Sequence, residues 1–385
     1  MKIASLFSNF LAKASPDVRV VIDIGSMSIK TVLLEKRGRD ICVLKKLVVE
    51  LPVREEMLSI IKFVNAYIRE ELFKIIKDLH RVPKKITIGF SGDYLENSIE
   101  AIAVERPHKS RNISEEEVAA IFKKSLGEIT SRREGMLLVD SFPVRVLVDG
   151  YEIEDVYKDM KGQRIGVYIF ASFMKKEHWE QFKNLGHILG GIPIKFVSNQ
   201  FVNAFSIPKV LKANEALLID VGARATEISL VRGGRIYSIE RFLFGGHTIT
   251  KAIAKALDAE YADADSIKRQ YQEQVLPQSV VSKIKGAVDE SVASWLKEFI
   301  SALSLDPHLM IPDNVFIFGG GAFLPELRAV LETGEWTKGF SWKQKTNISF
   351  LSAENISHGL LEEAKLTGFN EISFLSLIYY SYFVS

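Results

Sequence analysis

The sequence predicts an α/β protein built from a duplicated unit, with a cleft between the two halves. In the first unit an apolar strand ends in Asp23 and Gly25, turns on small residues and returns as a second strand. The same design recurs at Asp220 and Gly222, and a third glycine site at residues 319–321 joins a buried strand to a helix. Because 385 residues with 47% hydrophobic content bury more than one core, we expect two or more domains.

The first half is expected at residues 17–83 and 175–210. It begins with a strand from Val18, a tight turn, a second strand and a third strand near residues 41–51. A helix at residues 55–81 follows, because its apolar residues recur on one face at helical spacing.

Residues 84–174 change character and predict an α+β insert in the first half. The segments KITIGFSGDY and ENSIEAIAVERP are typical of strands. Ser114 and Glu117 form the pattern of a capping box at the start of a helix. Two further strand-rich runs, separated by the turn KDMKGQ, complete the insert.

The second half is expected as residues 211–249, a reduced small subdomain at 250–290, and residues 291–385. Its last apolar tract, residues 372–384, is too short to cross roughly 30 Å of hydrocarbon. We therefore predict a buried final helix there.

Residues 1–14 predict a short amphipathic helix. Its apolar residues fall at helical spacing, with Lys2 and Lys13 on the other face. Two interpretations stay open: the helix packs on its own domain, or it anchors the chain to a membrane surface. So short a helix binds lipid weakly, so that an anchor would need avidity from polymerisation or from a second anchor.

Composition argues against several other functions. The formal net charge of +2 provides no overall basic field, so we expect no nucleic-acid partner. The single cysteine, Cys42, excludes a disulfide within the chain and fits a reducing compartment. The seven histidines show no metal-ligand spacing.

The three glycine sites have the chemistry of a nucleotide site. Glycines at a hairpin let backbone N–H groups approach a phosphate, and serine or threonine hydroxyls add donors. Paired aspartates at facing strand ends hold the waters of a magnesium ion, and a lysine such as Lys30 neutralises phosphoryl charge. A glycine triplet before a helix can pack against a base or bind the α-phosphate.

The segments DIGSMSIK, IDVGARATEISLV and FGGGA resemble the phosphate and adenosine motifs of the actin-like ATPase superfamily. The resemblance implies two ribonuclease-H-like domains around a nucleotide cleft that binds ATP and Mg²⁺. Asp23 and Asp220 would hold the metal through water, Gln200 would orient the attacking water, and Glu227 takes the second acidic position. The residues implied at the cofactor are Asp23, Gly25, Ser26, Ser28, Lys30, Asp220, Gly222, Ala223, Arg224, Thr226, Gly245, Gly246, Asp265, Lys268, Gly319, Gly320, Gly321 and Ala322.

The insert is similar to that of FtsA, the bacterial cell-division family, which carries an SHS2-type domain there. In the insert, this resemblance is carried by FSGDYLENS, ISEEEV, FPVRVLVDGYEI and DMKGQRIGV. Further along the chain, FGGHTITKAIAKAL resembles the glycine-glycine segment that follows the second phosphate hairpin in the family. It implies a filament-forming cytoplasmic protein, peripheral at the inner face of the cell membrane, that binds itself, the C-terminal peptide of FtsZ, and lipid through residues 1–14. DIGSMSIK also resembles PilM, a scaffold of type IV pilus assembly, and a small-molecule kinase on the same fold is a third hypothesis.

The second phosphate hairpin departs from the family pattern. Ala223, Arg224 and Ala225 replace small donors, and Glu227 replaces an aspartate. We therefore expect ATP binding with slow or negligible turnover. The short segment after Gly246 reduces the region that contacts FtsZ in the family.

Overall fold

The structure, a computed structural model, describes residues 17–383 except 39, 53–55, 80–81, 154–159, 184, 190, 306–309, 343–345, 358–359, 363–365 and 367. The amphipathic helix expected at residues 1–14 lies outside the described residues. Among the helices that are described, none combines the length and the apolar character needed to span a membrane.

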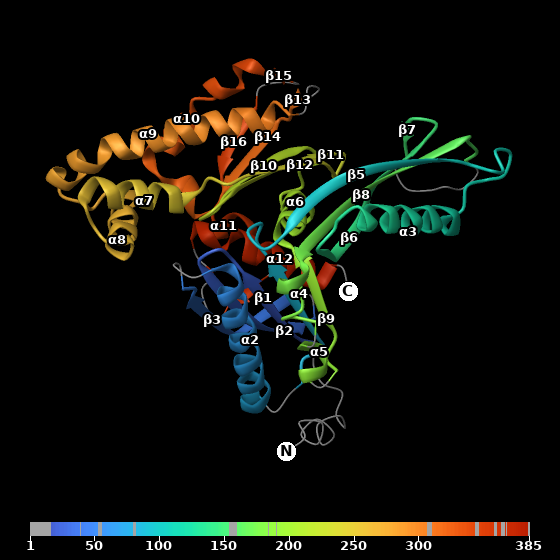
Figure 1. Ribbon diagram of the computed structural model, residues 1–385, viewed down its shortest axis with the longest axis horizontal. Coiled ribbons are helices and arrows are strands. Elements are labelled where there is room, and N and C mark those ends of the chain that lie inside the picture. Colours follow the sequence, from blue (N-terminus) through green and yellow to red (C-terminus); the bar gives the residue numbers. More distant parts are fainter. Residues whose placement is uncertain are drawn as a thin grey trace.

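A six-stranded sheet forms the first half (Figure 1). Three antiparallel strands are followed by two parallel ones, in the order β3-β2-β1-β4-β9, and β17 adds to the edge of β3. The strands are β1 (Asp17–Ile24), β2 (Ser28–Arg37), β3 (Asp40–Glu50), β4 (Lys85–Phe90), β9 (Ile194–Ser198) and β17 (Leu360–Glu362).

The second half repeats this topology in a five-stranded sheet. Its order, β12-β11-β10-β14-β16, again places three antiparallel strands before two parallel ones. The strands are β10 (Ala216–Val221), β11 (Thr226–Arg232), β12 (Arg235–Phe242), β14 (Asn314–Phe318) and β16 (Asn347–Phe350). The duplication predicted from the two Asp-x-Gly hairpins is therefore confirmed.

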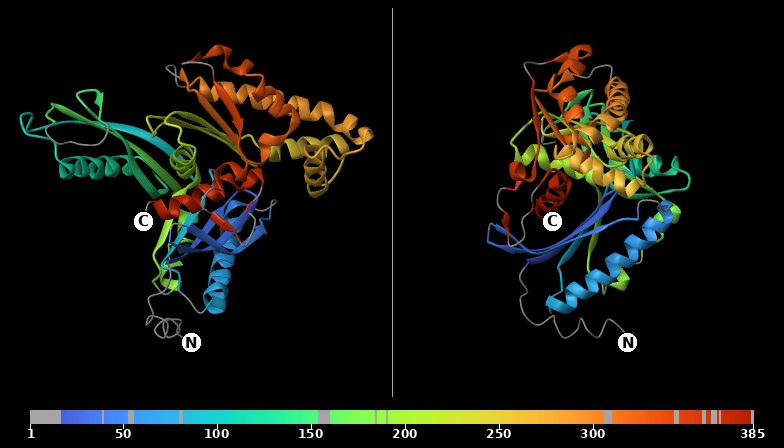
Figure 2. Two further views of the ribbon diagram at one scale, coloured as in Figure 1. Left: turned by 180° about the vertical axis from the view of Figure 1, so that it is seen from behind. Right: turned by 90° about the vertical axis from the view of Figure 1, so that its left-hand side faces the viewer.

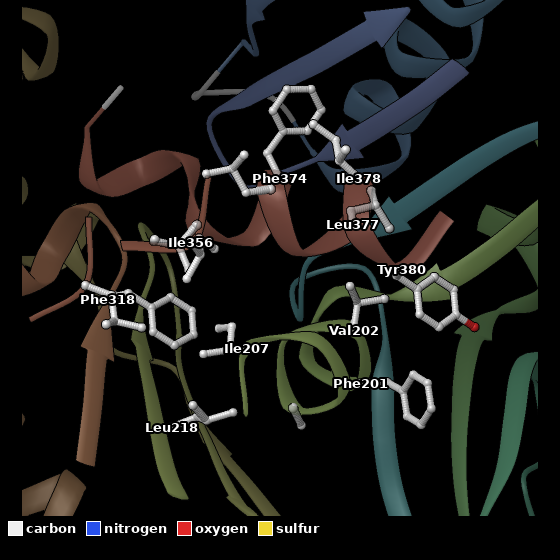
Figure 3. Close-up of a cluster of buried hydrophobic side chains, with 14 of the residues drawn as sticks. Phe201, Val202, Ile207, Leu218, Phe318, Ile356, Phe374, Leu377, Ile378 and Tyr380 are labelled. Atoms are coloured by element: carbon white, nitrogen blue, oxygen red, sulfur yellow. The ribbon is translucent and has the colours of Figure 1, made fainter. Parts of the chain in front are cut away.

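Two helices are sandwiched between the sheets and form the core that joins the halves (Figure 3). They are α6 (Asn199–Val210) and α12 (Ile372–Phe383), and the short α11 (Ala353–Ile356) lies beside them. Phe201 and Val202 of α6 and Leu377 of α12 belong to one buried cluster with residues of both sheets. The last apolar tract is thus a buried helix, as predicted.

Other helices cover the outer face of each sheet. The helix α2 (Met57–Leu79) buries one apolar face on the first sheet, and Figure 2 shows α2 and α12 on opposite faces of that sheet. The short α4 (Lys176–Trp179) and α5 (Leu185–Ile188) lie on the same side as α2. The second sheet is covered by α7 (Gly246–Leu257), α8 (Tyr261–Gln272), α9 (Gln278–Leu303) and α10 (Pro325–Glu332).

The insert is a four-stranded antiparallel sheet with one helix packed on it, and it extends away from α7–α10 (Figure 1). Its elements are β5 (Glu96–Glu105), α3 (Glu115–Ser131), β6 (Met136–Val148), β7 (Tyr151–Glu152) and β8 (Arg164–Lys175). The Ser114 hydroxyl accepts a hydrogen bond from the Glu117 amide at the start of α3.

One strand expected in the insert lies elsewhere. β4 pairs in parallel with both β1 and β9, so it is a central strand of the first-half sheet, and the insert sheet begins only at Glu96. The physical reason is burial: β4 is covered on both faces, whereas β5 alternates between half-buried and exposed residues at the edge of its sheet.

Candidate functional site

The two Asp-x-Gly hairpins have the same backbone turn. The Gly25 amide donates to the Ser28 carbonyl oxygen at 3.0 Å, and the Gly222 amide donates to the Ala225 carbonyl oxygen at the same distance. A Cβ atom at Gly222 would lie 3.0 Å from that carbonyl, so the tight turn favours glycine. The duplication therefore extends from the sheet order to single hydrogen bonds.

The hairpin tips offer backbone donors. Within the described part of the chain, no backbone hydrogen bond engages the amides of Ser26, Met27 or Ala223. Successive amides at such a turn form a concave site for an anion. The two tips therefore offer backbone donors of the kind that bind a phosphate group.

The helix α6 brings the two aspartates together. Asn199 donates from Nδ2 to Asp23 Oδ1 at 2.7 Å, and one turn later Asn203 donates to Asp220 Oδ2 at 3.4 Å. Ser373 of α12 also donates to Asp220 Oδ2, at 3.1 Å. Burial raises the pKa of Asp23, and it raises the pKa of Asp220 to about 7, an effect that the nearby charge of Asp23 increases.

Lys30 lies opposite Asp23 across the first hairpin, and its side chain is buried. Its ammonium group donates to the backbone oxygen of Asn370 and lies 3.7 Å from Glu371 Oε1. Glu371 also pairs with Lys46 at 3.2 Å. The lysine predicted to bind phosphate therefore ends beside a carboxylate of the short helix η3 (Phe369–Glu371).

The glycine triplet packs against the end of β10. Gly319 has φ +90°, and a Cβ atom there would lie 2.4 Å from Asp220 Oδ1. A Cβ atom at Gly321 would lie 2.7 Å from the Val221 side chain. Gly320 is exposed at the start of the helix η1 (Gly320–Phe323), whereas Ala322 is buried. The triplet thus brings backbone, rather than side chains, next to the second aspartate.

The glycine pair 245–246 packs against the backbone of the second hairpin. The Gly246 amide donates to the Gly222 carbonyl oxygen at 3.0 Å, and a Cβ atom at Gly245 would lie 2.5 Å from that oxygen. Lys268 of α8 donates to Asp265 at 2.7 Å and to the Gly246 carbonyl oxygen at 3.3 Å. The acidic-x-x-lysine pair therefore lies beside the second hairpin.

The two residues expected to act on water lie close together. Both Gln200 and Glu227 line a cavity of about 10 Å³, which is near the lower limit for one water molecule. Asn203, Leu218, Asp220, Ser229 and Phe318 complete its lining. The Gln200 amide already donates to the carbonyl oxygens of Ile228 and Glu240 and accepts from Asn97.

Glu227 is enclosed and carries an unsatisfied oxygen. Its Oε1 atom has no hydrogen-bond partner among the described residues. Burial, together with the charges of Asp220 and Asp93, raises the pKa of Glu227 to about 8, although Arg241 acts in the opposite direction. Burial therefore favours the protonated form of this carboxyl.

Thr226 is not brought to the site. Its hydroxyl donates to the Phe244 carbonyl oxygen at 2.7 Å and accepts from the Trp295 indole at 2.8 Å. The side chain therefore points into the core beneath α9, because neighbours on a strand face opposite sides and Glu227 faces the cleft.

The structure adds residues that sequence reasoning missed. Asp93, in the turn after β4, accepts a hydrogen bond from Ser26 and lies 3.7 Å from Arg224 Nε. Arg241 of β12 donates to the carbonyl oxygen of Gly92, where a Cβ atom would lie 2.4 Å from Glu227 Oε1. The sequence signal for Asp93 is SGDY, which the sequence alone marks only as part of the insert resemblance.

A magnesium nucleotide fits this donor set. The hairpin amides and Lys30 suit phosphate oxygens, and the buried Asp23 and Asp220 suit the water shell of Mg²⁺. In the described residues, no group of three or more Asp, Glu, His or Cys side chains could hold a metal ion by itself. The metal would therefore depend on water and phosphate ligands as well as on protein.

The match to the PilM-PilN type IV pilus biogenesis complex has a TM-score of 0.67 at 15% identity, and it covers 93% of this chain and 97% of that chain. The fold is actin-like. Residues 217–364 of this actin-like chain match the family model "Cell division protein FtsA".

Two curated proteins named "Cell division protein FtsA" resemble the actin-like chain. The Bacillus subtilis protein is 27% identical over 202 residues, which are 49% of this chain and 42% of that protein. The Streptococcus pneumoniae protein is 22% identical over 329 residues, 79% of this chain and 70% of that protein. The chain thus aligns with less than half the length of the first relative.

Proposed function

We propose that this actin-like protein binds ATP with Mg²⁺ between its two hairpins. One observation carries the proposal: α6 draws Asp23 and Asp220 together beneath two turns of identical hydrogen bonding. Asp23 and Asp220 hold the water shell of the metal, and Lys30 meets the terminal phosphates. The glycine triplet lets the nucleotide approach the backbone, and Asp265 and Lys268 lie along the ribose and base.

Turnover is slow. Gln200 would have to release three hydrogen bonds before its amide could orient a water molecule. Glu227, with a pKa of about 8, is a proton donor rather than a base at neutral pH. The protein therefore acts as a nucleotide-bound scaffold rather than as a fast enzyme.

Calorimetry with ATP and Mg²⁺ on the full chain and on Lys30→Ala tests the nucleotide site. Micromolar affinity that falls about tenfold or more in the variant supports it, since a charge-assisted contact to phosphate is lost. Lys46→Ala is the matched control, because Lys46 pairs with the same Glu371. No binding by the full chain, or equal losses in both variants, would refute the assignment.

The process we propose is bacterial cell division, in which the protein polymerises and tethers FtsZ to the inner face of the cell membrane. The sequence similarity to FtsA over residues 217–364 supports this reading. Two assays test it: binding of the FtsZ C-terminal peptide, and sedimentation with liposomes with and without residues 1–14. If the FtsZ peptide does not bind and removal of residues 1–14 leaves sedimentation with liposomes unchanged, the role in cell division is refuted. The proposed nucleotide site is not affected by that result.

Pilus assembly is the second candidate. It is favoured by the structural match to PilM, which covers nearly the whole of both chains. In this role the protein would be a cytoplasmic scaffold that binds a short peptide of an inner-membrane partner. Binding of such a peptide in place of the FtsZ peptide discriminates the two.

A further inference from the structure

Asp93 lies between the tips of the two hairpins. It belongs to the turn that follows β4, where the Tyr94 amide donates to the Ser91 carbonyl oxygen at 3.1 Å. The Ser26 hydroxyl of the first hairpin donates to its carboxylate, and Arg224 of the second hairpin lies 3.7 Å from it. One carboxylate therefore connects both halves of the molecule.

This contact is enclosed but incompletely bonded. The Asp93 side chain is 5% exposed and that of Arg224 is 23% exposed. A separation of 3.7 Å is too long for a hydrogen bond, and Asp93 Oδ2 has no hydrogen-bond partner among the described residues. The carboxylate is thus held by a hydrogen bond from Ser26 and by the charge of Arg224, and its Oδ2 atom accepts no hydrogen bond from the described residues.

The partners of Asp93 are those that a phosphate would use. A serine hydroxyl and a guanidinium group bind carboxylate and phosphoryl oxygens alike, and the backbone amides at both tips add donors. Arg241 holds the turn in place through the carbonyl oxygens of Gly92 and Leu95.

We infer that Asp93 occupies the position of the terminal phosphate and lowers the preference of the site for nucleoside triphosphate over diphosphate. The γ-phosphate displaces the carboxylate from Ser26 and Arg224, whereas a diphosphate ends before this position and leaves the Asp93–Arg224 pair intact. Asp93 and Arg224 are therefore specificity-determining residues. This inference rests on the proposed nucleotide site and goes beyond it.

Displacing the Asp93 carboxylate has both an unfavourable and a favourable contribution to the free energy of triphosphate binding. The γ-phosphate must break the ion pair, and in return Arg224 gains a ligand of higher charge. Asp93, released from Arg224, then lies near the phosphate as a like charge, which weakens triphosphate binding. Removing the charge at residue 93 therefore strengthens ATP binding and leaves ADP binding unchanged.

Calorimetry with ATP and with ADP, each with magnesium, tests this on the full chain, Asp93→Asn and Arg224→Ala. We expect Asp93→Asn to tighten ATP about tenfold and to change ADP less than twofold, because one charged contact no longer competes. Arg224→Ala should weaken ATP by a similar factor and leave ADP unchanged. Glu50→Gln is the charge-matched control, since its exposed carboxylate faces Arg269 elsewhere between the halves.

The outcomes separate the inference from the proposed function. If the full chain and both variants bind neither nucleotide, the nucleotide site itself is refuted. If the full chain binds ATP but the ratio of ATP to ADP affinity is the same in Asp93→Asn, Arg224→Ala and Glu50→Gln, the role of Asp93 is refuted. Since Arg224 is partly exposed, Arg224→Ala remains informative even where Asp93→Asn fails to fold.

Discussion

Replacing Glu227 with glutamine should stabilise the protein at alkaline pH. The carboxyl is buried, its Oε1 atom has no hydrogen-bond partner among the described residues, and the backbone at Gly92 approaches it closely. Burial above all, with the charge of Asp220, raises the pKa of Glu227 from 4.5 to about 8. Glutamine has nearly the same shape and carries no charge at any pH.

The sign follows from proton linkage. Between pH 4.5 and about pH 8 the folded protein keeps the proton that the unfolded chain has released, so the free energy of unfolding falls as the pH rises. The full loss is reached above the folded pKa, and it amounts to at most about 5 kcal/mol. The variant escapes this loss, so its advantage over the native protein grows from pH 5 to pH 9.

Urea denaturation followed by tryptophan fluorescence measures the effect. Trp295 donates to Thr226, the neighbour of Glu227, and therefore reports on this region. Glu290→Gln, on the exposed face of α9, is the control. An advantage of Glu227→Gln that is the same at pH 5 and pH 9 would refute the reasoning.

The other predictions concern packing. Gly89→Ala should destabilise by about 1–3 kcal/mol in thermal or urea unfolding, because its Cβ atom would lie 2.1 Å from Asn199 Oδ1 and 2.7 Å from the Leu377 side chain. Gly286→Ala, in the open on α9, should instead stabilise by about 0.5–1 kcal/mol, and equal effects at both glycines would contradict the steric argument. Arg145→Ala should lower the free energy of unfolding by about 2 kcal/mol, because the guanidinium lies 3.8 Å and 3.9 Å from the ring centres of Tyr168 and Tyr237. An unchanged urea midpoint would exclude this contact as a stabilising link between the insert and the second half.

The sequence was sufficient for the duplicated sheets because the signal is local and repeated. In each half, an apolar run that ends in aspartate and glycine predicts the first two strands, and the observed order of strands is the same in both sheets. The place of β4 could not be predicted in this way. A short apolar strand shows that it is buried, but it does not show which sheet supplies its neighbours.

The site was predictable only where it follows a motif. Asn199, Asn203 and Ser373 contact the two aspartates, yet they lie on helices far along the chain, and a single amide or hydroxyl on a helix has no distinctive spacing. The side of Thr226, in contrast, could have been deduced. Asp220 and Glu227 are paired across the hairpin and line the same small cavity, so the neighbouring residue Thr226 must face the other way.

The groups that would bind a nucleotide are also the groups that hold the two halves together. Lys30 of the first sheet pairs with Glu371 just before α12, and Arg224 of the second hairpin pairs with Asp93. A nucleotide must therefore exchange existing ion pairs for new ones, so that only the difference contributes to affinity. Glu371 directly precedes α12, the helix that lies between the sheets. When Lys30 leaves Glu371, the chain loses an ion pair at the start of that helix. We therefore expect nucleotide binding to change the packing of α12 in the core that both halves share.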